Sequence, residues 1–214
     1  MPEVIETVVY TFAELSTAAQ EAARDWYREL GAHHGWWEYI YEDFGAICDC
    51  LGIDLKTRPR NTGQTASQSE PCIWFSGFCC QGDGACFEAS WRYQRGGSLA
   101  IRAHAPQDTN LHGIADRLQE VQQRNFYQLV ADIAHQGRYH HEYTMRILVE
   151  RDSTNWQAPS ADAEDGVTEA MRDLARWLYK QLEAEYDFMN SDSEIEDAII
   201  ANEYTFTVSG RRFG

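Results

Sequence analysis

The chain has 214 residues, of which 43% are hydrophobic and 13% are aromatic. This composition is too apolar for a disordered chain, and no run reaches the roughly 18 apolar residues of a membrane-spanning helix. The length fits one substantial domain, or one domain with an appendage, and we expect a single α+β domain over residues 1–214. The first residues carry acids and no basic stretch, which argues against a signal peptide and predicts a cytoplasmic protein in a bacterial host cell.

The net charge is −16, from 34 acidic and 18 basic residues. The acids gather at both ends, because residues 1–57 hold 11 acids and 3 bases and residues 152–214 hold 14 acids and 5 bases. Such a charge repels nucleic acid and anionic lipid and favours a basic protein as partner. The alternative interpretation is that the acids only keep the protein in solution.

The first predicted element is a strand at 4–10, followed by a helix that Ser16 caps and Gly31 ends. A second helix is expected at 35–51 and ends at Gly52. Its apolar face consists of Trp37, Ile40, Tyr41, Phe44, Ile47, Cys48 and Leu51.

A hairpin is the clearest feature of the middle of the chain. Residues 72–80 have the composition of a strand, residues 85–93 alternate between apolar and polar, and a Gly-Asp-Gly turn joins them. Before this hairpin we expect a short strand at 53–57 and a polar loop near 58–70.

Helices and strands alternate over the rest of the chain. We expect a short helix at 97–105, a helix capped by Asp108, strands at 126–135 and 139–151, a polar loop at 153–165, an amphipathic helix from Gly166, a short helix capped by Ser191 or Ser193, and a strand at 203–208. Central strands with helices before, between and after them predict an α+β fold. We expect a mainly antiparallel sheet with helices packed on one face.

The cysteines show no spacing typical of a zinc site. Cys79 and Cys80 are adjacent, so on a strand their side chains would point to opposite faces. The alternative is a metal site in which Cys72, Cys80 and Cys86 cluster with a histidine. Free buried thiols in a reducing compartment are the favoured interpretation, and we therefore expect no metal and no cofactor.

Few residues point to catalysis. His104, His141, Glu142 and Asp83 are the acid–base candidates of a small metal-dependent enzyme, but no nucleophile motif accompanies them. We assign no catalytic residue, and the enzyme stays the weaker alternative.

Two segments are candidate partner-binding surfaces. The first is acidic and lies near the C-terminus: Asp187, Asp192, Glu194, Glu196 and Asp197. Held on one face, these carboxylates would imitate the phosphates of DNA and attract a basic groove, whereas the alternative is a solvated surface. The second surrounds the hairpin turn and consists of Gln81, Asp83, Trp74 and Phe78.

Four segments carry a resemblance: YTFAELSTAAQEAARDWYRE, WFSGFCCQGDGACFEASWRY, HAPQDTNLHGIADRLQEVQQRNFY and ANEYTFTVSGRRF. Over nearly the whole chain, the sequence resembles a phage and prophage protein family of unknown function, sometimes automatically named an antitoxin of a toxin–antitoxin stability system. The QGDGA stretch is its most distinctive segment. Cys79 and Cys80 stand where an aromatic residue and a serine are expected, which counts against a metal site. The resemblance implies phage origin and brings no catalytic residue.

Charge and implied origin together predict a phage-encoded interaction protein. It would inhibit a bacterial defence system, of the anti-CRISPR or anti-restriction type, by binding a basic nucleic-acid-binding protein as a DNA mimic. The second hypothesis is an antitoxin that neutralises a basic toxin, and the third is the small enzyme. We expect no direct contact with nucleic acid or membrane.

Overall fold

The computed structural model describes residues 6–30, 35–59, 69–155 and 157–214. The chain forms two compact units, and the single domain expected from the sequence stays a prediction. The sheet unit comprises residues 37–182, and the terminal unit comprises residues 1–36 and 183–214. Within the described ranges, no helix has both the length and the apolar character needed to span a bilayer.

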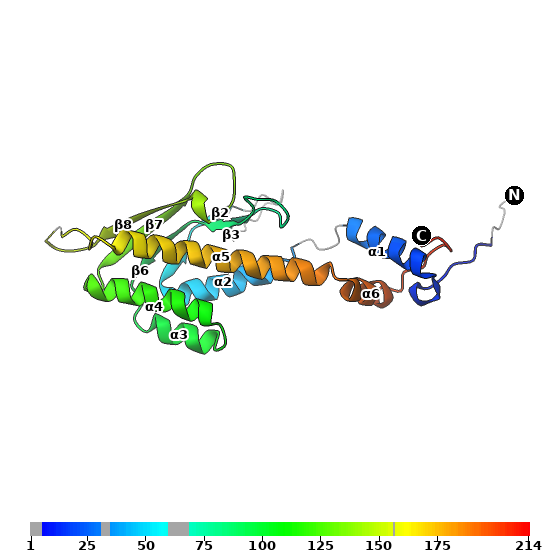
Figure 1. The fold of residues 1–214 in the computed structure, drawn as a ribbon, viewed down its shortest axis with the longest axis horizontal. Coiled ribbons are helices and arrows are strands. Elements are labelled where there is room, and N and C mark those ends of the chain that lie inside the picture. Colours follow the sequence, from blue (N-terminus) through cyan, green and yellow to red (C-terminus); the bar gives the residue numbers. More distant parts are fainter. Residues whose placement is uncertain (1–5, 31–34, 60–68, 156) are drawn as a thin grey trace. The chain divides into compact units, whose positions relative to one another are not determined.

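A four-stranded antiparallel sheet with the order β1-β6-β7-β8 forms the centre of the sheet unit (Figure 1). Its strands are β1 (Ile53–Leu55), β6 (Ala89–Arg92), β7 (Leu129–His135) and β8 (Met145–Arg151). Trp91 on β6 is paired in register with Ile53 of β1 on one side and with Ala131 of β7 on the other. Ala131 and Ile133 are buried while Asp132 between them is exposed, so one face of the sheet meets the core.

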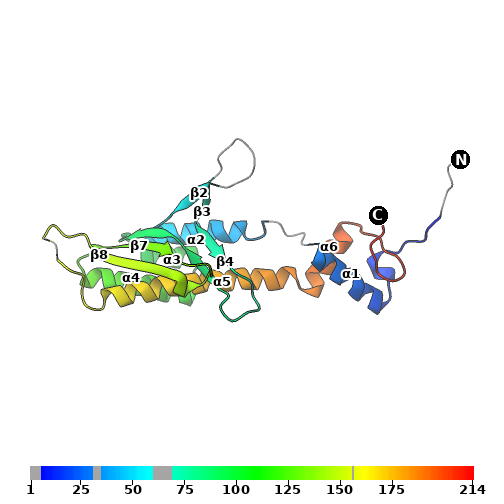
Figure 2. The same cartoon turned by 90° about the horizontal axis from the view of Figure 1, so that it is seen from above.

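The helices α2 (Glu38–Leu51), α4 (Thr109–Arg124) and α5 (Ala163–Met189) cover that face of the sheet, and α3 (Gly97–His104) packs on α2 and α4 (Figures 1 and 2). The last residues of α5 belong to the terminal unit. The predicted α+β fold with an antiparallel sheet is therefore confirmed. As expected, α2 ends at Gly52, which has the left-handed backbone (φ 75°) that glycine adopts without strain.

Asp108 begins α4 as the sequence predicted. One carboxylate oxygen, Oδ1, accepts the backbone N–H groups of Asn110 and Leu111, at 3.0 and 2.9 Å. The other oxygen, Oδ2, accepts the indole N–H of Trp177 on α5 at 2.7 Å. The ring of Trp177 stacks on Phe44 of α2, so this one aspartate joins a helix cap to the aromatic core.

Two strands begin later than their patterns indicate. Before β7, Phe126 and Tyr127 have positive φ angles (56° and 60°), which extended strands exclude. Before β8, a 3₁₀ turn, η2 (Glu142–Thr144), takes the place of the predicted start at 139. The pattern of β-branched and aromatic residues therefore indicated the strands but not their first residues.

Two short hairpins complete the sheet unit. One pairs β2 (Thr57–Pro59) with β3 (Ser69–Pro71), and the other pairs β4 (Ile73–Phe75) with β5 (Ala85–Phe87). The predicted polar loop near 58–70 therefore has paired ends, and its part at 60–68 lies outside the described residues. The predicted strand at 72–80 is wrong beyond Phe75, because residues 76–84 form a loop.

The terminal unit packs η1 (Phe12–Glu14), α1 (Thr17–Glu29) and α6 (Asp192–Ala201) around a small core. Ser16 caps α1 and Ser191 caps α6, as predicted, whereas Gly31 lies outside the described residues. The predicted strands at 4–10 and 203–208 are wrong in their described parts. Isolated bridges of Phe206 with Tyr10 and with Arg212 form there, and the chain turns back between Thr207 and Gly210.

Candidate functional site

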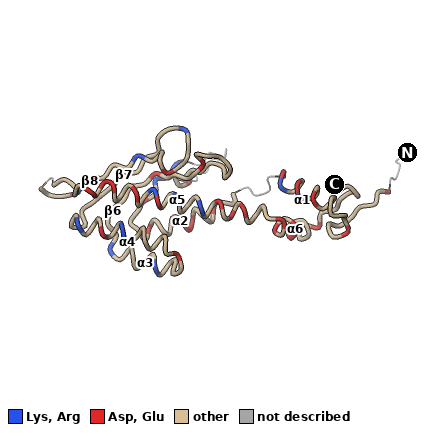
Figure 3. Tube along the Cα trace, in the orientation of Figure 1, with Lys and Arg blue, Asp and Glu red and all other residues tan. Residues whose placement is uncertain are grey.

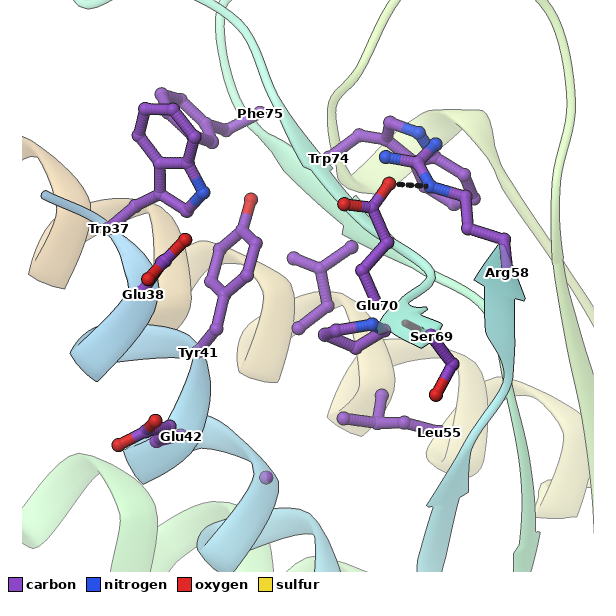
Figure 4. Close-up of a pocket in the computed structure, with 13 residues that line it drawn as sticks. Trp37, Glu38, Tyr41, Glu42, Leu55, Arg58, Ser69, Glu70, Trp74 and Phe75 are labelled. Atoms are coloured by element: carbon purple, nitrogen blue, oxygen red, sulfur yellow. Dashed lines mark hydrogen bonds and ion pairs between the residues drawn. The ribbon is translucent and has the colours of Figure 1, made fainter. Parts of the chain in front are cut away.

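A pocket of about 550 Å³ lies in the sheet unit, between the start of α2 and the two short hairpins (Figure 4). This volume falls in the range of small-ligand sites, which is about 300–1,000 Å³. Four aromatic side chains line it: Trp37, Tyr41, Trp74 and Phe75. Four charged side chains also line it: Glu38, Glu42, Arg58 and Glu70.

The first turns of α2 supply one wall. Trp37 and Tyr41 are four residues apart, and so are Glu38 and Glu42, so each pair lies on one side of the helix. The sequence placed both aromatic residues on the buried face of α2. The structure leaves them partly exposed, because they lie at the border of the stripe that Ile40 and the following core residues bury. The two i, i+4 pairs are the signal that sequence analysis overlooked.

The hairpins supply the opposite wall. Arg58 on β2 and Glu70 on β3 are directly paired in the ladder, and Arg58 Nε donates a hydrogen bond to Glu70 at 2.7 Å. The guanidinium carbon of Arg58 also lies 4.7 Å from the centroid of the Trp74 ring. The Glu70 carboxylate and the face of the Trp74 ring thus both contact the guanidinium of Arg58. This combination of groups stabilises cations in proteins.

Tyr41 provides an uncharged hydrogen-bond donor. Burial raises the pKa of Tyr41, and the nearby positive charge of Arg58 opposes this effect only in part. The phenol is therefore protonated at neutral pH. Figure 4 shows its hydroxyl pointing into the pocket between Trp37 and Glu70, and no described residue is its hydrogen-bond partner.

This chemistry suits a cation with a flat or apolar body. Among the described residues that line the pocket, three carboxylates outweigh one guanidinium, so an anion would meet repulsion. The aromatic faces attract a positive charge and also bury apolar surface. Arg58 itself demonstrates the fit, since its guanidinium already lies between Trp74 and Glu70.

The four contact residues predicted near the hairpin turn all lie in the sheet unit. Trp74 on β4 lines the pocket. Phe78 packs on Phe75, with the ring centroids 5.8 Å apart. Gln81 and Asp83 lie in the loop that joins β4 to β5. Among these four, Trp74 is therefore the residue that the structure places in the pocket wall.

The five acids predicted to imitate phosphates lie in the terminal unit: Asp187 on α5, and Asp192, Glu194, Glu196 and Asp197 on α6. Arg24 on α1 forms an ion pair with Glu196 at 2.6 Å, and Arg28 forms one with Asp192. Two of the five carboxylates are therefore neutralised within the unit. Figure 3 shows acidic and basic residues interspersed along the trace.

The acid–base candidates take part in separate structural contacts. His104 Nε2 lies 2.8 Å from Asp43, and His141 Nδ1 accepts the backbone N–H of Tyr143 at the start of η2. Glu142 forms an ion pair at 3.4 Å with a guanidinium on α5. In the described part of the chain these side chains form no common cluster.

Burial of the cysteines is confirmed only in part. Cys48, Cys72 and Cys86 are buried free thiols, as favoured, whereas Cys79 and Cys80 are exposed. Cys79 and Cys80 do not point to opposite faces of a strand, because they lie in a loop with their Sγ atoms 3.7 Å apart. Cys86 pairs with Trp74 in a ladder that ends before Cys80, so the alternative cluster of three cysteines does not form among the described residues.

The fold and the pocket define an α+β protein with an aromatic, acidic cavity. The chain belongs to the family of the domain of unknown function DUF8835, whose model matches residues 36–192. No curated protein and no solved structure matches the chain. The matched segment contains every residue of the pocket, whereas residues 1–35 and 193–214 lie outside it.

Proposed function

We propose that this chain is an acidic interaction protein that binds a basic segment of a partner protein and receives one cationic side chain of that segment in the pocket. The observation that carries the proposal is the placement of Arg58 between Trp74 and Glu70, because it shows that this wall accommodates a guanidinium. The net charge of −16 supports a basic partner by attracting it over long range.

Arginine is the side chain that fits the pocket best. A guanidinium is planar, stacks on aromatic rings and bonds carboxylates through two nitrogens, whereas an ammonium is a compact and strongly hydrated charge. Trp37 and Tyr41 supply aromatic rings to the α2 wall of the pocket. Glu38 and Glu42, also four residues apart, supply carboxylates to it. A second guanidinium would thus find on α2 the kinds of group that hold Arg58 on the hairpin.

The partner that we propose is a basic, nucleic-acid-binding component of a bacterial defence system, which the acidic protein inhibits by occupying its nucleic-acid groove. The charge supports this partner, and the resemblance to phage proteins supports a role against host defence. An antitoxin that masks a basic toxin rests on the same charge and on the automatic name of that family. These two roles differ in the partner and not in the chemistry of recognition.

A short peptide with one arginine, acetyl-Gly-Arg-Gly-amide, tests the pocket directly. The indole N–H signals of Trp37 and Trp74 in NMR spectra report occupancy during titration. We expect saturable binding at about millimolar Kd, as one side chain gives, and weaker binding at higher salt. The same peptide with glutamate in place of arginine should leave both signals unchanged.

Two double variants that lose the same amount of charge distinguish binding in the pocket from binding to the C-terminal acids. The first is Glu38→Gln with Glu42→Gln, and the matched control is Asp187→Asn with Asp197→Asn. We expect the first to weaken peptide binding about three- to tenfold, since each carboxylate contributes about 0.2–1 kcal/mol, and the control to leave it unchanged. Equal loss in both variants, or loss in the control alone, would overturn the assignment of the pocket.

Expression in bacteria distinguishes the two roles. A defence inhibitor should restore phage growth on a host that carries an active CRISPR or restriction system, and the Glu38→Gln, Glu42→Gln variant should restore it less. An antitoxin should instead rescue cells that express a toxin and leave phage growth unaffected. Failure in both assays would contradict the proposed role.

A further inference from the structure

The loop between β4 and β5, residues 76–84, contains metal-ligating side chains that the proposed function does not use. Its ends are fixed, because Ser76 N donates to the Gly84 carbonyl at 3.0 Å and Gly84 N donates to Ser76 Oγ at 3.1 Å. Ser76 Oγ also donates to the carbonyl of His140 at 3.2 Å. The hydroxyl of Tyr179 on α5 donates to the Gly77 carbonyl at 2.9 Å. The loop is thus anchored at its base.

Three metal-ligating side chains converge in this loop. The Sγ atoms of Cys79 and Cys80 are 3.7 Å apart, and one carboxylate oxygen of Asp83 lies within 4.8 Å of both. Asp83 Oδ2 accepts the backbone N–H groups of Cys79 and Cys80 at 3.1 and 2.7 Å, which holds the carboxylate beside the thiols. Both cysteines are exposed, so an ion can reach them without rearrangement of the core.

The separation of the two sulfur atoms matches one ion in particular. Zinc binds thiolates at about 2.3 Å in tetrahedral geometry, which places two sulfur ligands about 3.8 Å apart. The observed 3.7 Å therefore needs almost no movement of either side chain. Calcium and magnesium bind oxygen ligands, so two thiols disfavour them.

The local charge also favours a divalent cation. Asp83 holds a carboxylate beside the two thiols, and a carboxylate attracts a cation. A bound divalent cation would stabilise the thiolates that it ligates. The remaining cysteines are less suitable, because Cys48, Cys72 and Cys86 are buried and Cys50 is half-buried.

We propose that Cys79, Cys80 and Asp83 form a zinc site with two sulfur ligands and one oxygen ligand. Three protein ligands leave the fourth tetrahedral position to water or to a side chain of a partner. Binding converts two thiols into thiolates and releases their two protons, so affinity increases with pH. No redox step is involved.

The test uses the full chain, reduced with a non-thiol reductant and titrated with zinc against a colorimetric zinc indicator. We expect one equivalent of zinc to bind. Cobalt(II) should bind in its place and give the thiolate charge-transfer band and the intense visible bands of a tetrahedral site. Cys79→Ser and Cys80→Ser should each lower the affinity for zinc by more than about tenfold, because even indirect partners of a metal ligand cost tenfold or more.

Two further variants make the result specific. Asp83→Asn keeps an oxygen that accepts the backbone N–H groups but removes the charged ligand, so it should weaken zinc binding while the loop is retained. Cys50→Ser changes a half-buried thiol on α2 and should leave zinc binding unchanged. Absence of zinc binding in the reduced chain, or equal binding after both Cys79→Ser and Cys80→Ser are introduced, would overturn the proposal.

Discussion

Arg58 lies over the ring of Trp74, with 4.7 Å between the guanidinium carbon and the ring centroid. The same guanidinium donates a hydrogen bond to Glu70, so it covers an aromatic face of the pocket and neutralises a carboxylate. The guanidinium of Arg58 therefore makes the contacts with Trp74 and Glu70 that a cation of the proposed partner would make. Within the proposed function, Arg58 competes with the ligand instead of assisting it.

Replacement of Arg58 by glutamine should therefore strengthen binding of the arginine peptide. It exposes the ring of Trp74 and leaves Glu70 with its charge. A cation–π contact at an exposed site contributes about 0.5–1 kcal/mol, which corresponds to an increase in affinity of about two- to fivefold. Calorimetric titration of wild type and Arg58→Gln measures the change. Weaker binding by the variant would show that Arg58 holds the pocket open or contacts the ligand itself.

Asp108 should have a large effect on stability, because it caps α4 and also accepts the indole N–H of Trp177. Asp108→Ala removes both interactions and should lower the free energy of unfolding by about 2–4 kcal/mol. Asp108→Asn keeps one oxygen for the cap and should cost less. Urea denaturation gives both values, and a cost below about 1 kcal/mol for the alanine variant would mean that water replaces the carboxylate.

Local signals in the sequence were enough to predict most helices and the fold class. Ser16, Asp108 and Ser191 cap helices as predicted, and Gly52 ends α2. Each signal acts through hydrogen bonds or backbone angles within a few residues, so a single sequence reveals it. The buried face of α4, which includes Leu111, Ile114, Leu118 and Val121, also follows from the spacing of its apolar residues.

The pocket could not be predicted because it depends on contacts between distant segments. Its hairpin wall includes Arg58 paired with Glu70 on the neighbouring strand. The sequence predicts a single polar loop near residues 58–70, so it does not reveal this pairing. The apolar and aromatic composition of residues 72–80 predicts a strand, whereas the part that holds Cys79 and Cys80 forms a loop. Composition describes what a segment can bury, whereas the hydrogen bonds that anchor a loop appear only in the fold.

Gly84 should not tolerate a side chain. A Cβ atom there would lie 2.6 Å from Cβ and 2.9 Å from Cα of His141, and backbone cannot move aside easily. Gly84→Ala should lower the free energy of unfolding by about 1–3 kcal/mol. The control is Gly113→Ala in α4, where a Cβ meets nothing within 4 Å and helix propensity predicts a gain of up to about 1 kcal/mol. Equal effects of the two variants in urea denaturation would contradict this argument.

Asp173 should make stability depend on acid pH. Burial acts to raise the pKa of Asp173, but hydrogen bonds from Arg176 at 2.6 Å and from Arg117 more than offset it, so the pKa is lowered. The unfolded chain then binds this proton more tightly than the folded chain. The stabilisation is complete above the unfolded pKa and is lost as the pH falls through the folded pKa. We therefore expect Asp173→Asn to cost about 1 kcal/mol at neutral pH and progressively less below pH of about 4.

Urea denaturation at several pH values measures this change for Asp173→Asn, with Glu120→Gln as control. Glu120 is an exposed acid on α4, the helix that also carries Arg117. The control should follow the wild type at every pH, because its removal breaks no ion pair among the described residues. The curves of wild type and Asp173→Asn should converge in acid, since a protonated Asp173 no longer attracts the two guanidinium groups. Curves that stay parallel down to the acid transition would show that the lowered pKa contributes nothing to folding.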